Sequence, residues 1–379
     1  MRTKSLASLV LIFVVLITAV LSSLPFTEKS TSSGVAAAIV TDTPVSQTLA
    51  EACEAAGTGN CVSSWVGKYV ALYGIPAAAE YIMRAKTPFE VNSCHSVMHE
   101  LGIYAVENAE QDSIPALTDD LPGVCTFGYQ HGIALGVAKR FTVAADYDRI
   151  AVTLCDAYKG DVAFYSPCVH GIGHGSIHVH SNDVIEASRV CESFGSEQNW
   201  CVGGAVMEWG ATGGASSLLQ NSLSLATSVC ADLVELTKDA RTADECAQQI
   251  APIAYNAFGE RSTILNWCSS RSTESEQRRC SQGVGYTFDR EKTLDVAHIK
   301  NECSLVKNNT VLSGCLEAAA QMLYPRWAVP DETLLSTLCD GYSDSISERC
   351  KTGLERGRVS LKDGPSLDGI ANPSIGSSL

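Results

Sequence analysis

Residues 150–175 read IAVTLC-DAYKGDVAFYSP-CVHGIGHG, with two cysteines, Cys155 and Cys168, at the ends of the central segment. The apolar segment before Cys155 is typical of the end of an amphipathic helix, and the segment after Cys168 is typical of the start of a second helix. Small residues after Cys168 allow close contact between helices. The stretch therefore predicts a helical hairpin whose connecting loop lies between the two cysteines.

The same pair of cysteines recurs along the chain. The first members follow one another at steps of 35 to 39 residues: Cys155, Cys191, Cys230, Cys268, Cys303 and Cys339. The second members follow at steps of 33 to 45 residues: Cys168, Cys201, Cys246, Cys280, Cys315 and Cys350. Such periods are typical of two-helix units, which stack because one unit cannot bury its own apolar face. We therefore expect an all-α fold, an α-solenoid of helical hairpins over residues 48–356.

The N-terminus predicts export. Arg2 and Lys4 precede a nearly unbroken apolar run over residues 6–26, which suits a signal peptide and is also long enough for a membrane anchor. Residues 27–47 are predicted to be a linker and residues 357–379 a disordered tail. On either interpretation the folded part is secreted or lies at the extracellular surface, and it contacts a membrane only through an uncleaved N-terminal segment.

The sixteen cysteines are an even number, and in an exported chain they indicate disulfides rather than thiolate ligands or catalytic thiols. We expect each close pair to clip the loop of one hairpin, at about 2 to 3 kcal/mol of stabilisation per loop. The expected pairs are Cys53 with Cys61, Cys155 with Cys168, Cys191 with Cys201, Cys230 with Cys246, Cys268 with Cys280, Cys303 with Cys315, and Cys339 with Cys350. Cys94 and Cys125 remain and are paired by elimination.

Composition limits the possible partners. The 45% of hydrophobic residues can bury a large core, and the formal net charge of −15 repels phosphate backbones. We therefore expect no nucleic-acid partner, whereas metal cations would be attracted.

Seven of the eight histidines fall between His95 and His180. His131 and His174 each lie six residues after the leading cysteine of their segment, so the repeat places them on equivalent helix faces. Two further pairs, His95 with His99 and His170 with His174, have the i,i+4 spacing that brings two imidazoles to one face of a helix. Because neutral imidazole is a common metal ligand, the pattern predicts a metal site within residues 94–180.

The number of ions stays open at this stage. Six imidazoles, those of His95, His99, His131, His170, His174 and His178, suffice for two ions with three ligands each. A single four-coordinate site from His95, His99, His170 and His174, with His131 outside it, is the simpler alternative. All-imidazole ligation suits copper, zinc or nickel, and a thioether from Met207 would favour copper.

Three segments carry a resemblance to a known family: residues 94–102 (CHSVMHELG), 125–132 (CTFGYQHG) and 168–175 (CVHGIGHG). They resemble secreted tetratricopeptide-like repeat proteins with disulfide-clipped hairpins and a two-copper histidine site, some of which form extracellular filaments. The resemblance implies His95, His99, His131, His170 and His174 as ligands, while His178 is added on helical spacing alone. The usual Trp/Leu/Gly/Tyr consensus of these repeats is missing, and units after residue 230 carry no aligned histidine, which indicates scaffold.

Three functions follow as expectations. The first is a non-catalytic extracellular protein that binds copper, with one or two ions and zinc as the alternative, and that polymerises head to tail with itself. The second is a copper-dependent, oxidase-like enzyme with a two-copper site, and the third is a protein-binding repeat scaffold. Hydrolase motifs are missing from the sequence, and Glu100 and Glu208 are interpreted as solvated or hydrogen bonded to the histidine cluster rather than catalytic.

Overall fold

The computed structural model describes residues 48–362, except 54–58, 85–87, 120, 122–124, 126, 291–294 and 324–331. This part of the chain contains helices and no strand, which confirms the all-α prediction. Helices longer than one turn are α2 (Leu49–Cys53), α3 (Gly59–Met83), α4 (Pro88–Asn108), α5 (Gly128–Arg140), α6 (Ala144–Leu154), α7 (Val162–Val179), α9 (Gln198–Trp209), α10 (Ala215–Thr237), α11 (Arg241–Phe258), α12 (Arg261–Ser269), α13 (Glu274–Tyr286), α14 (Val296–Cys303), α15 (Asn309–Leu323), α16 (Glu332–Ser336) and α17 (Asp344–Lys362).

Shorter or tighter helical segments join these helices. They are the 3-10 segments η1 (Gln111–Asp119), η2 (Asp156–Tyr158), η3 (Ser188–Glu197), η5 (Thr287–Arg290) and η6 (Thr337–Cys339), the four-residue α8 (Val184–Ala187) and the π turn η4 (Gly210–Gly214).

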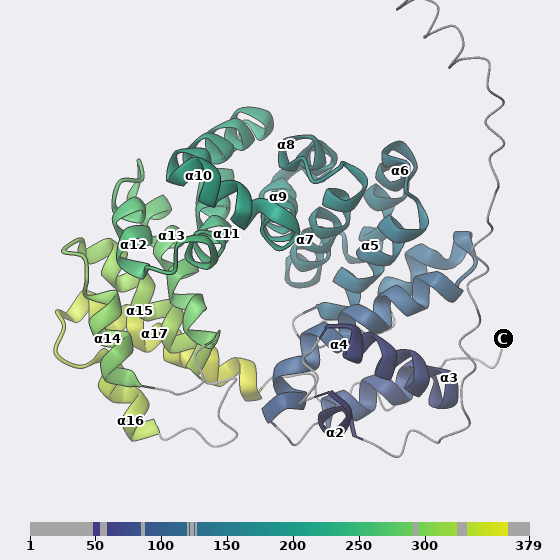
Figure 1. Cartoon of the computed structure of the whole chain (residues 1–379), viewed down its shortest axis with the longest axis horizontal. Helices are drawn as coiled ribbons and strands as arrows, with labels where there is room; N and C mark the ends of the chain where they lie inside the picture. The colour runs from purple at the N-terminus through teal and green to yellow at the C-terminus, as the bar shows by residue number, and fades with distance from the viewer. Residues whose placement is uncertain are drawn as a thin grey trace, which may run out of the picture. The chain divides into compact units, whose positions relative to one another are not determined.

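The helices that carry or follow the second cysteines form one continuous row, which begins with α4, the helix that carries Cys94. In this row, α4, α5, α7, α9, α11, α13, α15 and α17 each pack on the next, in the order of the sequence (Figure 1). The helices that carry or precede the first cysteines pack on their own partners, as α6 does on α7, α10 on α11, α12 on α13 and α14 on α15. This arrangement is the stacking of helical hairpins that the cysteine period predicts.

All sixteen cysteines are paired: seven disulfides join the pairs expected from the close spacing, and the eighth joins Cys94 with Cys125, the pair expected by elimination. Their Cα–Cα separations, from 5.4 to 5.9 Å, lie in the usual range for this bond. A chain so rich in disulfides belongs in an oxidising, extracellular environment. No thiolate is left to bind a metal, so any metal site must use other ligands.

The parts of the prediction that concern the two ends of the chain lie mostly outside the described residues. This applies to the signal peptide or anchor over 1–26, to the linker over 27–47 and to the tail from residue 363 onward. Helix α17 continues to Lys362, six residues beyond the predicted end of the repeat domain at 356. Among the helices of the described part, none has the length and apolar character needed to cross a membrane.

Neighbouring row helices touch backbone to backbone at glycines. A Cβ atom on Gly204 would lie 1.9 Å from the carbonyl oxygen of His170, and one on Gly283 would lie 2.1 Å from that of Gln248. On Gly353 it would lie 2.0 Å from that of Glu317. Each of these glycines lies three residues after the second cysteine of its unit. The repeat therefore sets the helix separation, and only glycine is small enough at these contacts.

We expect Gly283→Ala to lower the free energy of unfolding by about 1 to 3 kcal/mol, because the added methyl group has to push α13 away from the backbone of α11. The matched control is Gly67→Ala in α3, where an added Cβ meets no atom within 4 Å. That control should be neutral or stabilising by up to about 1 kcal/mol, since alanine favours a helix. Denaturant unfolding of both variants measures the difference, and equal effects would contradict the close-packing argument.

Candidate metal centre

Three consecutive row helices carry the six predicted ligands. His95 and His99 lie on α4, His131 lies on α5, and the other three, His170, His174 and His178, lie on α7. Helix α4 packs on α5 and α5 packs on α7, so the three helices present their histidines to a common region. The i,i+4 spacing on α4 and α7 stacks the side chains on one face of each helix.

Five of the six imidazoles form one connected cluster. On the side of α4, the ring centroids of His95 and His99 are 4.4 Å apart, and they lie 5.3 and 5.5 Å from the centroid of His131. On the side of α7, the rings of His170 and His174 lie 5.3 and 5.1 Å from His131 and 5.0 Å from each other. His131 is therefore the central member of the cluster and contacts both helical pairs.

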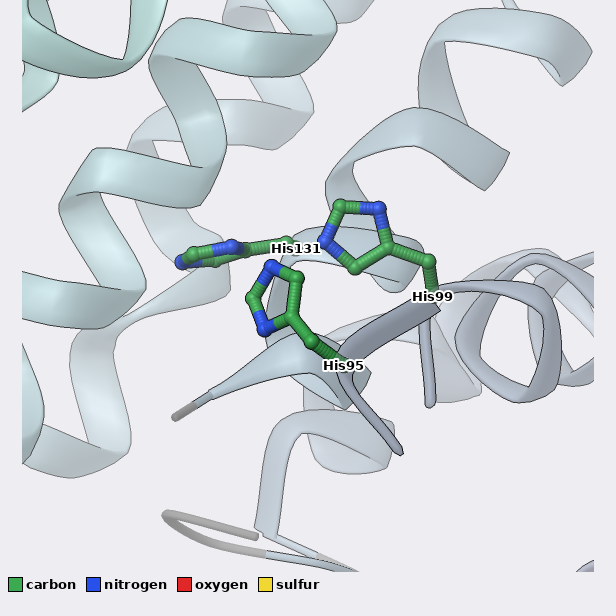
Figure 2. Close-up of side chains that lie close together, drawn as sticks. All are labelled: His95, His99 and His131. Atoms are coloured by element: carbon green, nitrogen blue, oxygen red, sulfur yellow. The ribbon is translucent and has the colours of Figure 1, made fainter. Parts of the chain in front are cut away.

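The α4–α5 side brings three ligand atoms closest together. One ring nitrogen from each of His95, His99 and His131 lies within 4.8 Å of the other two. Figure 2 shows these three rings converging from two helices onto the same region. Three imidazole nitrogens at this separation can bind one ion after small side-chain rotations.

The outer nitrogens of the cluster are held by backbone carbonyls. His95 Nδ1 donates to the oxygen of Cys125 at 2.9 Å, and His170 Nδ1 donates to that of Trp200 at 3.0 Å. His131 Nε2 donates to the oxygen of Pro167 at 3.2 Å. Since a carbonyl only accepts, the proton resides on these nitrogens and the opposite ring nitrogen keeps its lone pair. This is the usual way of fixing a metal-binding tautomer.

The inner nitrogens are buried and lack protein partners in the described part of the chain. They are His99 Nε2, His131 Nδ1 and His174 Nε2. Leaving a buried polar atom unsatisfied costs about 1 to 3 kcal/mol. His99 and His131 also belong to the group of three ligand atoms that lie within 4.8 Å of one another, whereas His174 lies outside that group. Orphan nitrogens beside such a group fit a bound cation, because a metal ion accepts several lone pairs.

Burial keeps the imidazoles uncharged. Desolvation lowers the pKa of His95, and it lowers those of His99 and His131 well below the ordinary value, with neighbouring histidines adding repulsion. The same two causes lower the pKa of His170 to about 3. These rings are therefore neutral at pH 7, which is the form that binds metals.

Glycines bring the histidine helices together. A Cβ atom on Gly132 would lie 2.1 Å from the carbonyl oxygen of His99, and one on Gly171 would lie 2.9 Å from Cδ2 of His131. The helices can therefore approach until their imidazoles meet. Gly132 and Gly171 are thus packing residues at the centre of the cluster.

Glu208, on α9, is the carboxylate of the centre. Its two oxygens accept hydrogen bonds of 2.9 Å from His174 Nδ1 and from His178 Nε2. Burial alone would raise the pKa of this carboxyl group, but the two hydrogen bonds lower it to about 2. The interpretation of Glu208 as hydrogen bonded to the cluster is thus confirmed, and His178 is turned toward this carboxylate.

Met207 and the two other histidines of the chain, His180 and His298, have surroundings of their own. The Met207 side chain is 47% exposed, so its thioether faces solvent rather than a buried ion. His180 hydrogen bonds to Asp148 at 3.3 Å, and His298 packs against the ring of Phe288.

Sequence reasoning missed the backbone acceptors of the candidate ligands. Cys125, Pro167 and Trp200 lie 30, 36 and 30 residues after the histidines that they bind. These separations are close to the repeat period, so each histidine is held by the next unit. The repeat period could have indicated which unit supplies the acceptor. It could not indicate which residue does so, because every residue has a backbone carbonyl.

The comparisons with known proteins give no relative. No family model matches the chain, and neither the curated proteins nor the solved structures include a significant match. The tetratricopeptide-like and copper-site parts of the resemblance therefore gain no support from them, while the helical, disulfide-rich character is shown by the structure.

We expect the metal-free protein to lose stability as the pH falls below about 6.5, the ordinary pKa of histidine. Because burial lowers the pKa of these histidines in the folded state, the unfolded chain binds more protons below that pH. Each ring that stays neutral then costs about 1.4 kcal/mol per pH unit. Thermal unfolding in chelator between pH 7.5 and 5.5 measures the slope. A His131→Gln variant should show a shallower slope, and a flat profile for the unmodified protein would contradict the buried neutral cluster.

Proposed function

We propose that this protein is an extracellular metal-binding protein whose histidine cluster holds copper. The observation that carries the proposal is the set of three buried, unpartnered ring nitrogens on His99, His131 and His174. The opposite nitrogens of His131 and His174 are already hydrogen bonded, so the orphan nitrogens are the ones that carry lone pairs. The folded cluster therefore already presents lone pairs that an ion can accept.

His131 belongs among the ligands in this proposal. Its orphan nitrogen Nδ1 is buried, and its ring lies between the α4 pair and the α7 pair. This favours a site that includes His95, His99 and His131 over the four-coordinate alternative that leaves His131 outside. His170 and His174 then supply either further ligands to the same ion or ligands to a second ion beside it.

The donor set favours copper. All ligands are imidazoles, since every cysteine is in a disulfide and Met207 faces solvent. For a given set of nitrogen ligands, Cu²⁺ binds more tightly than the other divalent ions of the first transition row, Zn²⁺ included. Zinc remains the alternative wherever copper is scarce.

The test is metal binding by the full chain. We expect the protein to bind at least one Cu²⁺ per chain, and His131→Ala to weaken that binding by at least about 100-fold, more than the loss of a supporting group. His298→Ala is the matched control, because it removes an imidazole far along the sequence on α14 and should leave the affinity unchanged. Elemental analysis and competition with a chromophoric chelator give the two readouts. Equal affinities of His131→Ala and the unmodified protein would refute the site.

The other functions expected from the resemblance and the repeat remain predictions. Filament assembly, oxidase-like turnover and protein binding all depend on surfaces or open ligand positions outside the contacts described above. Negative-stain microscopy of concentrated protein tests the first, and oxygen consumption by the copper-loaded protein tests the second.

A further inference from the structure

The carboxylate of Glu208 joins a solvent-exposed imidazole to a buried one. Its two oxygens bind one nitrogen each of His174 and His178, both at 2.9 Å. The side chain of His178 is 41% exposed, that of Glu208 is 15% exposed and that of His174 is 6% exposed. The bridge therefore runs inward from the protein surface and ends on a ring that belongs to the histidine cluster.

The hydrogen bond decides which nitrogen of His174 is available. An ionised carboxylate only accepts, so Nδ1 of His174 carries the proton and Nε2 keeps the lone pair. Nε2 is the buried nitrogen without a protein partner in the described residues. A carboxylate on the far nitrogen also makes an imidazole a stronger donor to a metal and prevents the ring from turning over.

The backbone of Glu208 is held in place as well. It lies in the last turn of α9, and its carbonyl oxygen accepts a hydrogen bond of 2.9 Å from the Thr212 hydroxyl in the π turn that follows. Two residues beyond Glu208, a Cβ atom on Gly210 would lie 2.3 Å from Ile253, so the end of α9 packs tightly on α11. A single π turn within a helix is often found at a functional site.

We propose that Glu208 is a positioning residue of the metal centre, which presents His174 Nε2 to the ion, and that His178 holds the Glu208 carboxylate instead of binding the ion. This inference rests on the proposed function. The two carboxylate oxygens of Glu208 then have different roles. One orients the His174 ring, and the other is held by His178 at the surface. Glu208 also brings one negative charge next to a cation that neutral imidazoles alone leave uncompensated.

The experiment compares Glu208→Ala and His178→Ala with the unmodified full chain. We expect Glu208→Ala to weaken Cu²⁺ binding by about 10- to 100-fold, the usual effect of losing a carboxylate partner of a ligand histidine. His178→Ala should weaken it by less than about 10-fold, because the carboxylate remains. Glu100→Gln is the control, since it removes a negative charge next to the ligand His99 while leaving Glu208 intact.

A second readout separates positioning from a general loss of structure. In the metal-free protein, the ¹⁵N shifts of the His174 ring should show a proton on Nδ1, and Glu208→Ala should abolish that preference while the rings of His95 and His170 keep theirs. Glu208→Gln should restore part of the affinity, because its amide oxygen can still accept from His174.

Each outcome bears on the inference. Unchanged affinity and an unchanged His174 tautomer in Glu208→Ala would overturn it, and so would a slower association rate at constant affinity, which would make Glu208 a capture group. A loss in His178→Ala as large as that in His131→Ala would make His178 a ligand and overturn its assignment as an anchor. If the unmodified protein bound no metal, the proposed function would fail, whereas the His174 tautomer would still report on the Glu208 contact.

Discussion

Backbone contact between neighbouring row helices is the constraint on which the other features of this protein depend. At Gly204, Gly283 and Gly353, the space for a Cβ atom is already taken by a carbonyl oxygen of the preceding row helix. Helices can come this close only where glycine lies at the crossing. The disulfides clip the hairpin loops, and through them the crossings recur in the same register along the row.

The short helix separation also creates the chemistry of the histidine cluster. Imidazoles from three helices meet at centroid distances near 5 Å, which leaves little room for water. Burial then disfavours the charged form, so the rings stay neutral, and it leaves three nitrogens without a partner in the described part of the chain. The folded protein thus carries a local energetic cost that a bound ion would remove. The cost is tolerated because the rest of the row is well packed and cross-linked.

Later units use the same row for a different purpose. Two residues after the second cysteine, His170 is replaced by Gln248, Gln282 and Glu317, all of them buried. In these later units, buried carboxylates are paired with arginines of the next row helix. Glu245 pairs with Arg279 at 2.7 Å, and Glu317 pairs with Arg356 at 2.6 Å. These pairs link consecutive row helices through opposite charges rather than through a cluster of imidazoles. This agrees with the interpretation of the units after residue 230 as scaffold.

The helical class, the six disulfide pairs from Cys155 onward and the alignment of His131 and His174 could be predicted from the sequence, because all three follow from a one-dimensional period. Cys53 with Cys61 was expected from its similar close spacing, and Cys94 with Cys125 by elimination. The period could not show which histidines meet or what holds them. The folded structure was needed to show that His131 lies at the centre, that backbone carbonyls of the next unit accept from the outer nitrogens, and that His178 faces Glu208. These outcomes depend on the rotation of each helix about its axis and on the distance between helices. Both are set by packing between segments some thirty residues apart, which local spacing does not encode.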